Sequence, residues 1–183
     1  MTPTHLPGRT AIPALPEQTR IPSSATAAAT ALDDFNSASA DEARRLLLAC
    51  LHSPPWARRL TDHRPYPDAG SLLAAADEAA YDLAPDDLAA ALAAETPAAL
   101  PDDTYSAAHT ALSAAYAAYE ARFGHTFVIC LAGLGPDETL DHVLEGIRSR
   151  LANDPEDERT VAADELRRLA GQRLAQSLGS ARR

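Results

Sequence analysis

Residues 119–130 read Tyr-Glu-Ala-Arg-Phe-Gly-His-Thr-Phe-Val-Ile-Cys. Upstream of Gly124, apolar residues recur at helical spacing, and glycine readily adopts the left-handed conformation that ends a helix. The following run from Thr126 to Leu131 is largely β-branched or apolar, but it is only about one short strand in length. Without a partner strand, this run is expected to form an extended connector after a long helix.

Helical signals surround this connector. Ser39 and Glu42 form a capping box, and Pro85 and Pro136 are each followed by acidic residues, which favour a helix N-terminus. The run Asn153–Asp154–Pro155–Glu156 repeats this arrangement before the last apolar stripe. The sequence therefore predicts an all-α, single-domain bundle of about seven to eight helices with one short extended segment. The expected helices cover about residues 40–51, 71–83, 85–94, 105–123, 136–151 and 155–178, with a short one near Trp56.

The length and composition set the domain organisation. With 183 residues, of which 46% are apolar, the chain can build one well-buried core but is too short for two ordinary enzyme domains. Residues 1–31 contain five prolines among Thr, Ser and Ala, and such a composition buries too little surface to offset its ordering entropy. We expect a flexible tail over residues 1–31 and one helical domain over residues 32–180.

Charge and cysteine content exclude several partners. The net charge is −10, no lysine occurs, and the arginines are interspersed with acids, so no nucleic-acid or anionic-membrane surface is expected. No apolar run is long enough to span a membrane, and the N-terminus lacks the order of a secretory signal. Cys50 and Cys130 lie far apart without metal-ligand spacing, which indicates free thiols in a reducing compartment. A cytoplasmic protein is expected.

Several motifs together resemble one enzyme family. They are Phe35–Asn36, Ser53 with Trp56–Ala57, Arg64–Pro65–Tyr66 and, most specifically, the run Phe123–Cys130. In this order they resemble the decarboxylases of 2-oxo-4-hydroxy-4-carboxy-5-ureidoimidazoline (OHCU), and the resemblance extends from Phe35 to Leu178. It implies a decarboxylase that forms (S)-allantoin in urate catabolism, without metal or organic cofactor, and a homodimer. No nucleotide, flavin or metal signature in the sequence opposes a cofactor-free site.

The resemblance also assigns residues, and this chain departs from the family in two motifs. In the family, the main chain of the segment matching Phe123–Cys130 contacts the substrate ring, and an arginine matching Arg173 binds substrate. The family's catalytic histidine precedes a proline, whereas this chain reads Glu95–Thr96–Pro97, so that either Glu95 or Thr96 takes the histidine's place. The family motif Trp-Ser-x-x-Glu-Gln reads Tyr-Ser-Ala-Ala-His-Thr over residues 105–110.

An acid and an imidazole are thus retained with their positions exchanged. We expect Glu95 to face His109 as the catalytic pair, with the carboxylate holding the imidazole tautomer. On this hypothesis His109→Asn abolishes turnover without affecting the fold. Ser106 would orient the ligand, and Arg173 would bind its carboxylate or urea oxygen. The full set of expected substrate-binding residues is Pro97, Ser106, Thr110, Phe127, Val128, Ile129, Cys130 and Arg173.

Each residue also has an ordinary structural interpretation. His109 can be a solvated or capping residue, Glu95 a surface acid, and Arg173 a cation that favours the helix C-terminus and pairs with Glu165 or Asp164. Two further functions therefore stay open beside the decarboxylase. One is a family member that acts on another small nitrogen heterocycle in specialised metabolism, and the other is a non-catalytic binding or assembly protein on the same fold.

Overall fold

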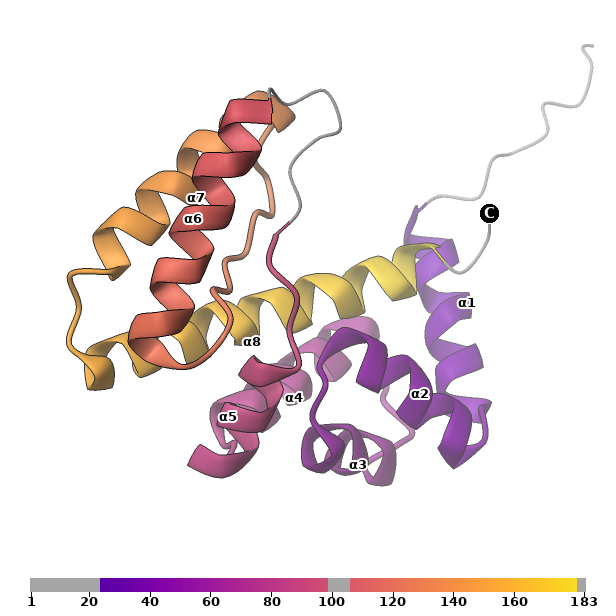
Figure 1. Cartoon of the computed structure of the whole chain (residues 1–183). Coiled ribbons are helices and arrows are strands. Elements are labelled where there is room, and N and C mark those ends of the chain that lie inside the picture. The colour runs from indigo at the N-terminus through magenta and orange to yellow at the C-terminus, as the bar shows by residue number, and fades with distance from the viewer. Residues whose placement is uncertain (1–23, 99–105, 181–183) are drawn as a thin grey trace, which may run out of the picture.

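The computed structural model describes residues 24–98 and 106–180 of the chain. Within these residues it contains eight helices and no strand (Figure 1). The prediction of an all-α fold with one extended segment is therefore confirmed, since residues 125–131 are not helical. The helices are α1 (Ser24–Ser37), α2 (Ala40–Cys50), α3 (Pro54–Asp62), α4 (Ala69–Tyr81), α5 (Pro85–Ala93), α6 (Ser106–Phe123), α7 (Pro136–Arg150) and α8 (Pro155–Ser180).

The long helix α8 organises the fold. It packs against α1, α2, α4 and α5, and α6 packs against α7 (Figure 1). Residues four apart along α8 form one buried stripe, because positions i and i+4 share a helix face. This stripe consists of Glu158, Ala162, Leu166, Ala170, Leu174 and Leu178.

The extended segment 126–131 lies between two hydrophobic cores. Successive side chains of an extended chain point to opposite sides. Accordingly Val128 joins the core of α1–α5 and α8, while Phe127 and Ile129 join the core of α6 and α7. Gly124 ends α6 with φ of 75°, as the sequence predicts. The segment is thus buried on both sides.

Helix α1 begins earlier than expected. Residues 24–31, which the sequence analysis assigned to a flexible tail, form the first turns of α1, and Ala31 is buried with Leu32 and Phe35 in the core. The alanine-rich run provides strong helix formers, and α8 supplies a surface on which the helix can bury them. The rest of the expected tail, residues 1–23, lies outside the described residues.

Local signals set the other helix ends. The capping box of α2 forms as predicted, with the Ser39 amide donating to Glu42 at 3.0 Å and the Glu42 amide donating to the Ser39 hydroxyl at 3.3 Å. The indole of Trp56 is buried and donates to the carbonyl of Ala76 at 2.9 Å. Both cysteines are free, as expected.

Candidate functional site

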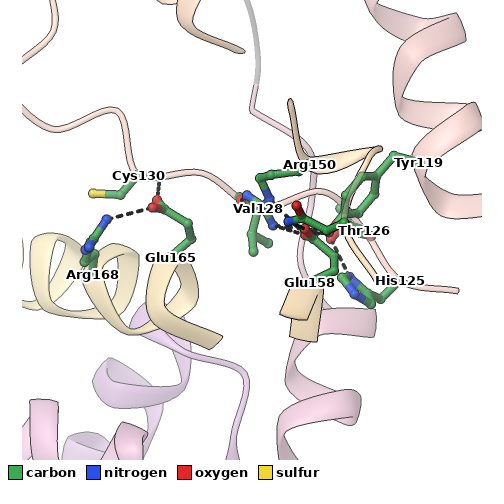
Figure 2. Close-up of polar contacts among 10 residues, drawn as sticks. Tyr119, His125, Thr126, Val128, Cys130, Arg150, Glu158, Glu165 and Arg168 are labelled. Carbon is green, nitrogen blue, oxygen red and sulfur yellow. Dashed lines mark hydrogen bonds and ion pairs between the residues drawn. The ribbon is translucent and has the colours of Figure 1, made fainter. Parts of the chain in front are cut away.

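Side chains from other elements hold the extended segment in place. Its buried backbone groups need hydrogen-bond partners, and no neighbouring strand in the described part of the chain supplies them. Arg150 of α7 donates from Nη1 to the carbonyl of Val128 at 2.6 Å, and the amide of Cys130 donates to Oε2 of Glu165 in α8 at 2.8 Å (Figure 2). Two helices therefore fix the path of this segment.

The first of these contacts belongs to a buried ionic network. Arg150 donates from Nε at 2.8 Å and from Nη2 at 2.6 Å to Oε1 of Glu158, which is fully buried (Figure 2). Glu158 also accepts a hydrogen bond from the hydroxyl of Tyr119 and one from Asn153 at 2.9 Å. Burial, together with the hydrogen bond to Glu158, raises the pKa of Tyr119 above its usual range. The two buried charges thus neutralise each other, and the neutral side chains of the network form hydrogen bonds with Glu158, as burial of polar groups requires.

Sequence reasoning missed Glu158, although a signal for it exists. Its position falls in the apolar i, i+4 stripe of α8 with Ala162 and Leu166, where an acid without a cationic partner would be costly. Arg150, which stands eight residues earlier, is the partner that the structure gives it. An acid in register with an apolar i, i+4 stripe can therefore indicate a buried ion pair, even where other acids surround it at the helix start.

A pocket of about 360 Å³ lies between the loop after α5, the extended segment and α8. Its volume falls at the small end of the range that holds small molecules, which is about 300–1,000 Å³. Among the residues expected to bind substrate, five line this pocket although they come from three separate parts of the sequence. The lining residues are Thr96, Pro97, Ala98, Phe127, Val128, Ile129, Leu131, Leu169, Gln172 and Arg173.

A bidentate ion pair lies beside this pocket. Arg173 donates from Nη1 to Oε1 of Glu95 at 2.9 Å and from Nη2 to Oε2 at 2.8 Å, and Nη1 also donates to the carbonyl of Cys50 at 3.0 Å. The Glu95 side chain is 1% exposed and that of Arg173 is 29% exposed. The hydrogen bond to Glu95 raises the pKa of Arg173. Glu95 is therefore not a surface acid, and Arg173 does not pair with Glu165 or Asp164.

The expected contact between Glu95 and His109 is not formed. Both carboxylate oxygens of Glu95 are taken by Arg173, and His109 is exposed on α6. No hydrogen bond or ion pair joins the two residues within 24–98 and 106–180. The imidazole near Glu95 is instead that of His52, whose Nδ1 lies 3.9 Å from Oε1 of Glu95. Sequence reasoning missed His52 because it lies 43 positions before Glu95 (95 − 52 = 43).

The remaining expected residues are divided between the pocket and the surface. Cys130 lies beside the pocket, and its thiol donates to Oε1 of the lining residue Gln172 at 3.3 Å. Thr110 is exposed on α6, near His109. The side chain of Ser106 lies outside the described part of the structure. The catalytic and binding roles of these residues stay predictions.

Gly146 of α7 lets the pocket wall approach closely. A Cβ atom at this position would lie 3.0 Å from Cδ1 of Ile129 and 3.4 Å from Cζ of Phe127. We expect Gly146→Val to lower the free energy of unfolding by about 1–3 kcal/mol, because an overpacked core must shift. Urea unfolding measures this effect. The matched control is Gly171→Val in α8, where a Cβ meets nothing within 4 Å; equal losses in both variants would contradict the steric explanation.

Two absences hold for the described residues. No group of three or more His, Cys, Asp or Glu side chains in residues 24–98 and 106–180 is arranged to hold a metal ion. None of the eight helices has both the length and the apolar character that crossing a bilayer requires.

Comparison with known proteins places this geometry in a family. The family model for OHCU decarboxylase matches residues 36–100 and 93–175. A crystal structure of (S)-allantoin synthase is similar with a TM-score of 0.64 and 21% sequence identity, over 80% of this chain and 53% of that one. A crystal structure of OHCU decarboxylase in the presence of (S)-allantoin has a TM-score of 0.62 and 20% identity, over 76% of this chain and 97% of that one. This chain thus spans about half the length of the allantoin synthase. Among curated proteins, none matches the sequence.

Proposed function

Because this chain belongs to the OHCU decarboxylase family, we propose that it removes carbon dioxide from OHCU, or from a closely related nitrogen heterocycle, in urate catabolism. The observation that supports this proposal is the pocket itself. Arg173 and residues 127–129, which the family resemblance implies as substrate-binding parts, line one cavity of suitable size. Pro97, from the loop that replaces the family's catalytic histidine, lines the same cavity.

The pocket divides into a polar side and an apolar side. Arg173, Gln172 and Thr96 offer polar groups for the oxygen atoms of a ring and its ureido substituent. Pro97, Leu131 and Leu169 are apolar, as are the side chains of the extended segment in the lining, and we place the substrate carboxylate against the apolar side. A carboxylate held there gains little from the protein, whereas the transition state, in which its charge has moved into the ring, is stabilised at the polar side.

The reaction needs no external electron carrier. The bond between the hydroxyl-bearing ring carbon and the carboxylate breaks and carbon dioxide leaves. The electron pair forms a double bond to the neighbouring ring carbon, while the electrons of the carbon–nitrogen double bond move to nitrogen, which takes up a proton. The resulting enol loses its hydroxyl proton and takes up a proton on carbon, so that one proton is gained overall. Thr96 is the hydroxyl in the pocket lining, at one of the two positions that can replace the family's histidine, and we propose that it relays this proton from solvent.

An enantioselective assay tests the proposal. OHCU is generated in place by enzymatic oxidation of urate and hydrolysis of hydroxyisourate, and the circular dichroism of allantoin is followed with and without the protein. We expect faster product formation and an excess of the S enantiomer. Racemic allantoin at the uncatalysed rate would refute the decarboxylase proposal.

A second candidate, a protein that binds a small heterocycle without decarboxylating OHCU, is favoured by one observation. Glu95 already neutralises Arg173, so the pocket does not present a free cation to an anionic substrate. Isothermal titration with (S)-allantoin separates the two candidates when the enantioselective assay is negative. Saturable binding without turnover would support the binding protein, and absence of both would reject it.

The His109→Asn variant tests the acid–imidazole pair that the sequence suggested. Since the imidazole is exposed and does not line the pocket, we expect kcat/KM to stay within about twofold of the unmodified protein. Steady-state rates from the allantoin assay measure this, with circular dichroism at 222 nm as the check on folding. A loss of about 100-fold or more in a folded variant would instead restore His109 as a catalytic residue.

A further inference from the structure

We propose that Glu95 determines specificity: it is a resident carboxylate that fills the end-on face of Arg173 (Nη1 and Nη2) and neutralises its charge, so that the pocket accepts neutral oxygen atoms at this guanidinium and discriminates against ligand carboxylates. The inference rests on the proposed function in one respect, that the pocket beside Arg173 is the ligand site. It goes beyond the family resemblance, because in the family this stretch carries the catalytic histidine, and here it carries Glu95 and Thr96.

The geometry of Arg173 shows which donors are taken. A guanidinium has five N–H groups, and a carboxylate binds best when two of them point at it in parallel. Nη1 donates to Glu95 and to the carbonyl of Cys50, and Nη2 donates once to Glu95. The two other N–H groups, on Nε and Nη2, have no partner among the described residues. They form the side-on pair of donors of a guanidinium whose charge Glu95 already neutralises. We therefore expect them to favour an uncharged carbonyl or ureido oxygen over a second carboxylate.

Burial of Glu95 makes it difficult for a ligand to displace this residue from Arg173. Its side chain is almost fully removed from solvent, and its amide donates to the carbonyl of Leu92 at the end of α5 at 3.3 Å. A ligand carboxylate could take the end-on face only by displacing Glu95, which would then be a buried carboxylate with no neighbouring group but the imidazole of His52, 3.9 Å away. If it bound beside Glu95 instead, it would meet a like charge at short range in a poorly solvated site. Both routes disfavour a carboxylate at Arg173.

This arrangement is also compatible with decarboxylation. A cation that pairs with the substrate carboxylate stabilises the ground state, and that stabilisation is lost when carbon dioxide leaves. By occupying Arg173, Glu95 leaves the guanidinium to the oxygens that stay on the ring. We therefore expect Glu95→Gln to lower KM and kcat together on OHCU, because the freed guanidinium binds the substrate carboxylate more tightly than the transition state.

The direct test uses two planar probes that differ by one carboxylate, uracil and orotate. For the unmodified protein, we expect uracil to bind at least about tenfold more tightly than orotate in NMR titrations. In Glu95→Gln, we expect the dissociation constant of orotate to fall at least about tenfold, while that of uracil changes less than about threefold. Glu156→Gln is the matched control, since it removes the same charge from an exposed side chain of α8 that pairs with Arg159. This variant should keep the preference of the unmodified protein for uracil over orotate.

Several outcomes would overturn the inference. Equal binding of the two probes to the unmodified protein would do so, and so would a Glu95→Gln variant that binds uracil but gains nothing for orotate. If Glu95→Gln does not fold, Glu95→Asp replaces it, because the shorter side chain cannot fill both positions and should give an intermediate preference. If the unmodified protein turns over OHCU but Glu95→Gln does not change the preference between uracil and orotate, this inference alone is overturned. An altered preference without turnover of OHCU would overturn the decarboxylase proposal alone. Binding of neither probe would overturn this inference, whereas the decarboxylase proposal is decided by the allantoin assay.

Discussion

Glu158→Gln should lower the free energy of unfolding by about 3–5 kcal/mol, since it leaves Arg150 as a buried cation without a counter-charge. Arg150 has a side chain that is only 7% exposed, and it gives two hydrogen bonds to Oε1 of Glu158. Glutamine keeps the shape of the side chain and one acceptor, but it removes the charge that compensates the guanidinium. Urea unfolding followed by circular dichroism measures the loss.

The same helix offers a matched control for this prediction. Glu156 lies in the first turn of α8, as Glu158 does, so both acids experience the favourable end of the helix dipole. Glu156 is 81% exposed, and its partner Arg159 is half exposed, so Glu156→Gln should cost no more than about 1 kcal/mol. If the two variants lose the same stability, burial of the ion pair is not the cause.

A double replacement separates the charge from the packing. In Arg150→Met with Glu158→Leu, no buried charge is left unpaired, and the stability should return to within about 1–2 kcal/mol of the unmodified protein. The carbonyl of Val128 nevertheless loses its donor, so the extended segment would no longer be held at the pocket wall. We therefore expect this variant to fold but to bind (S)-allantoin more weakly, as titration calorimetry would show.

Arg173→Lys should reduce kcat/KM on OHCU by about 100-fold or more in a protein that still folds, if the proposed function is correct. Lysine keeps the positive charge that neutralises Glu95, but a single ammonium cannot hold the carboxylate in the bidentate manner and offer further N–H groups to the ligand. The allantoin assay gives the rate, and thermal unfolding reports stability.

Two other variants complete the comparison. Arg148→Lys in α7 makes the same exchange at an exposed arginine that pairs with Glu145, and it should leave the rate unchanged. Arg173→Met removes the charge and leaves the buried Glu95 without its bidentate partner, with only the half-exposed imidazole of His52 nearby, so it should also lose about 3–5 kcal/mol of stability. A fully active Arg173→Lys variant would show that the guanidinium does not contribute to the reaction.

The sequence predicted the helices well because their ends depend on near neighbours. Ser39 with Glu42, Pro85, Pro136 and Gly124 each act within a few residues, and the structure has a helix end at each of them. The start of α1 was missed because the prolines of the first 23 residues dominated the composition. The alanine run that follows them is helical, and it depends on α8, which lies far along the chain.

The site was less predictable because it depends on distant partners. Glu95 and Arg173 are 78 positions apart, and no local pattern shows that they meet. Matching of motifs placed Glu95 and His109 at corresponding positions of the family, but it could not show that the first side chain is buried and the second exposed. By contrast, residues 127–129 belong to one contiguous motif, so matching this motif was enough to predict them as part of the site. The structure has these three residues in the lining of the cavity.

Helix α8 carries both Glu158, which anchors the pocket wall through Arg150, and Arg173 at the pocket. They are 15 positions apart (173 − 158 = 15), which corresponds to about 22 Å along a continuous helix. One inserted residue between them would rotate Arg173 by about 100° away from Glu95 while leaving Glu158 in place. The relative orientation of the two sites therefore depends on the number of residues between them in this helix. In related proteins, insertions and deletions should be confined to the loops.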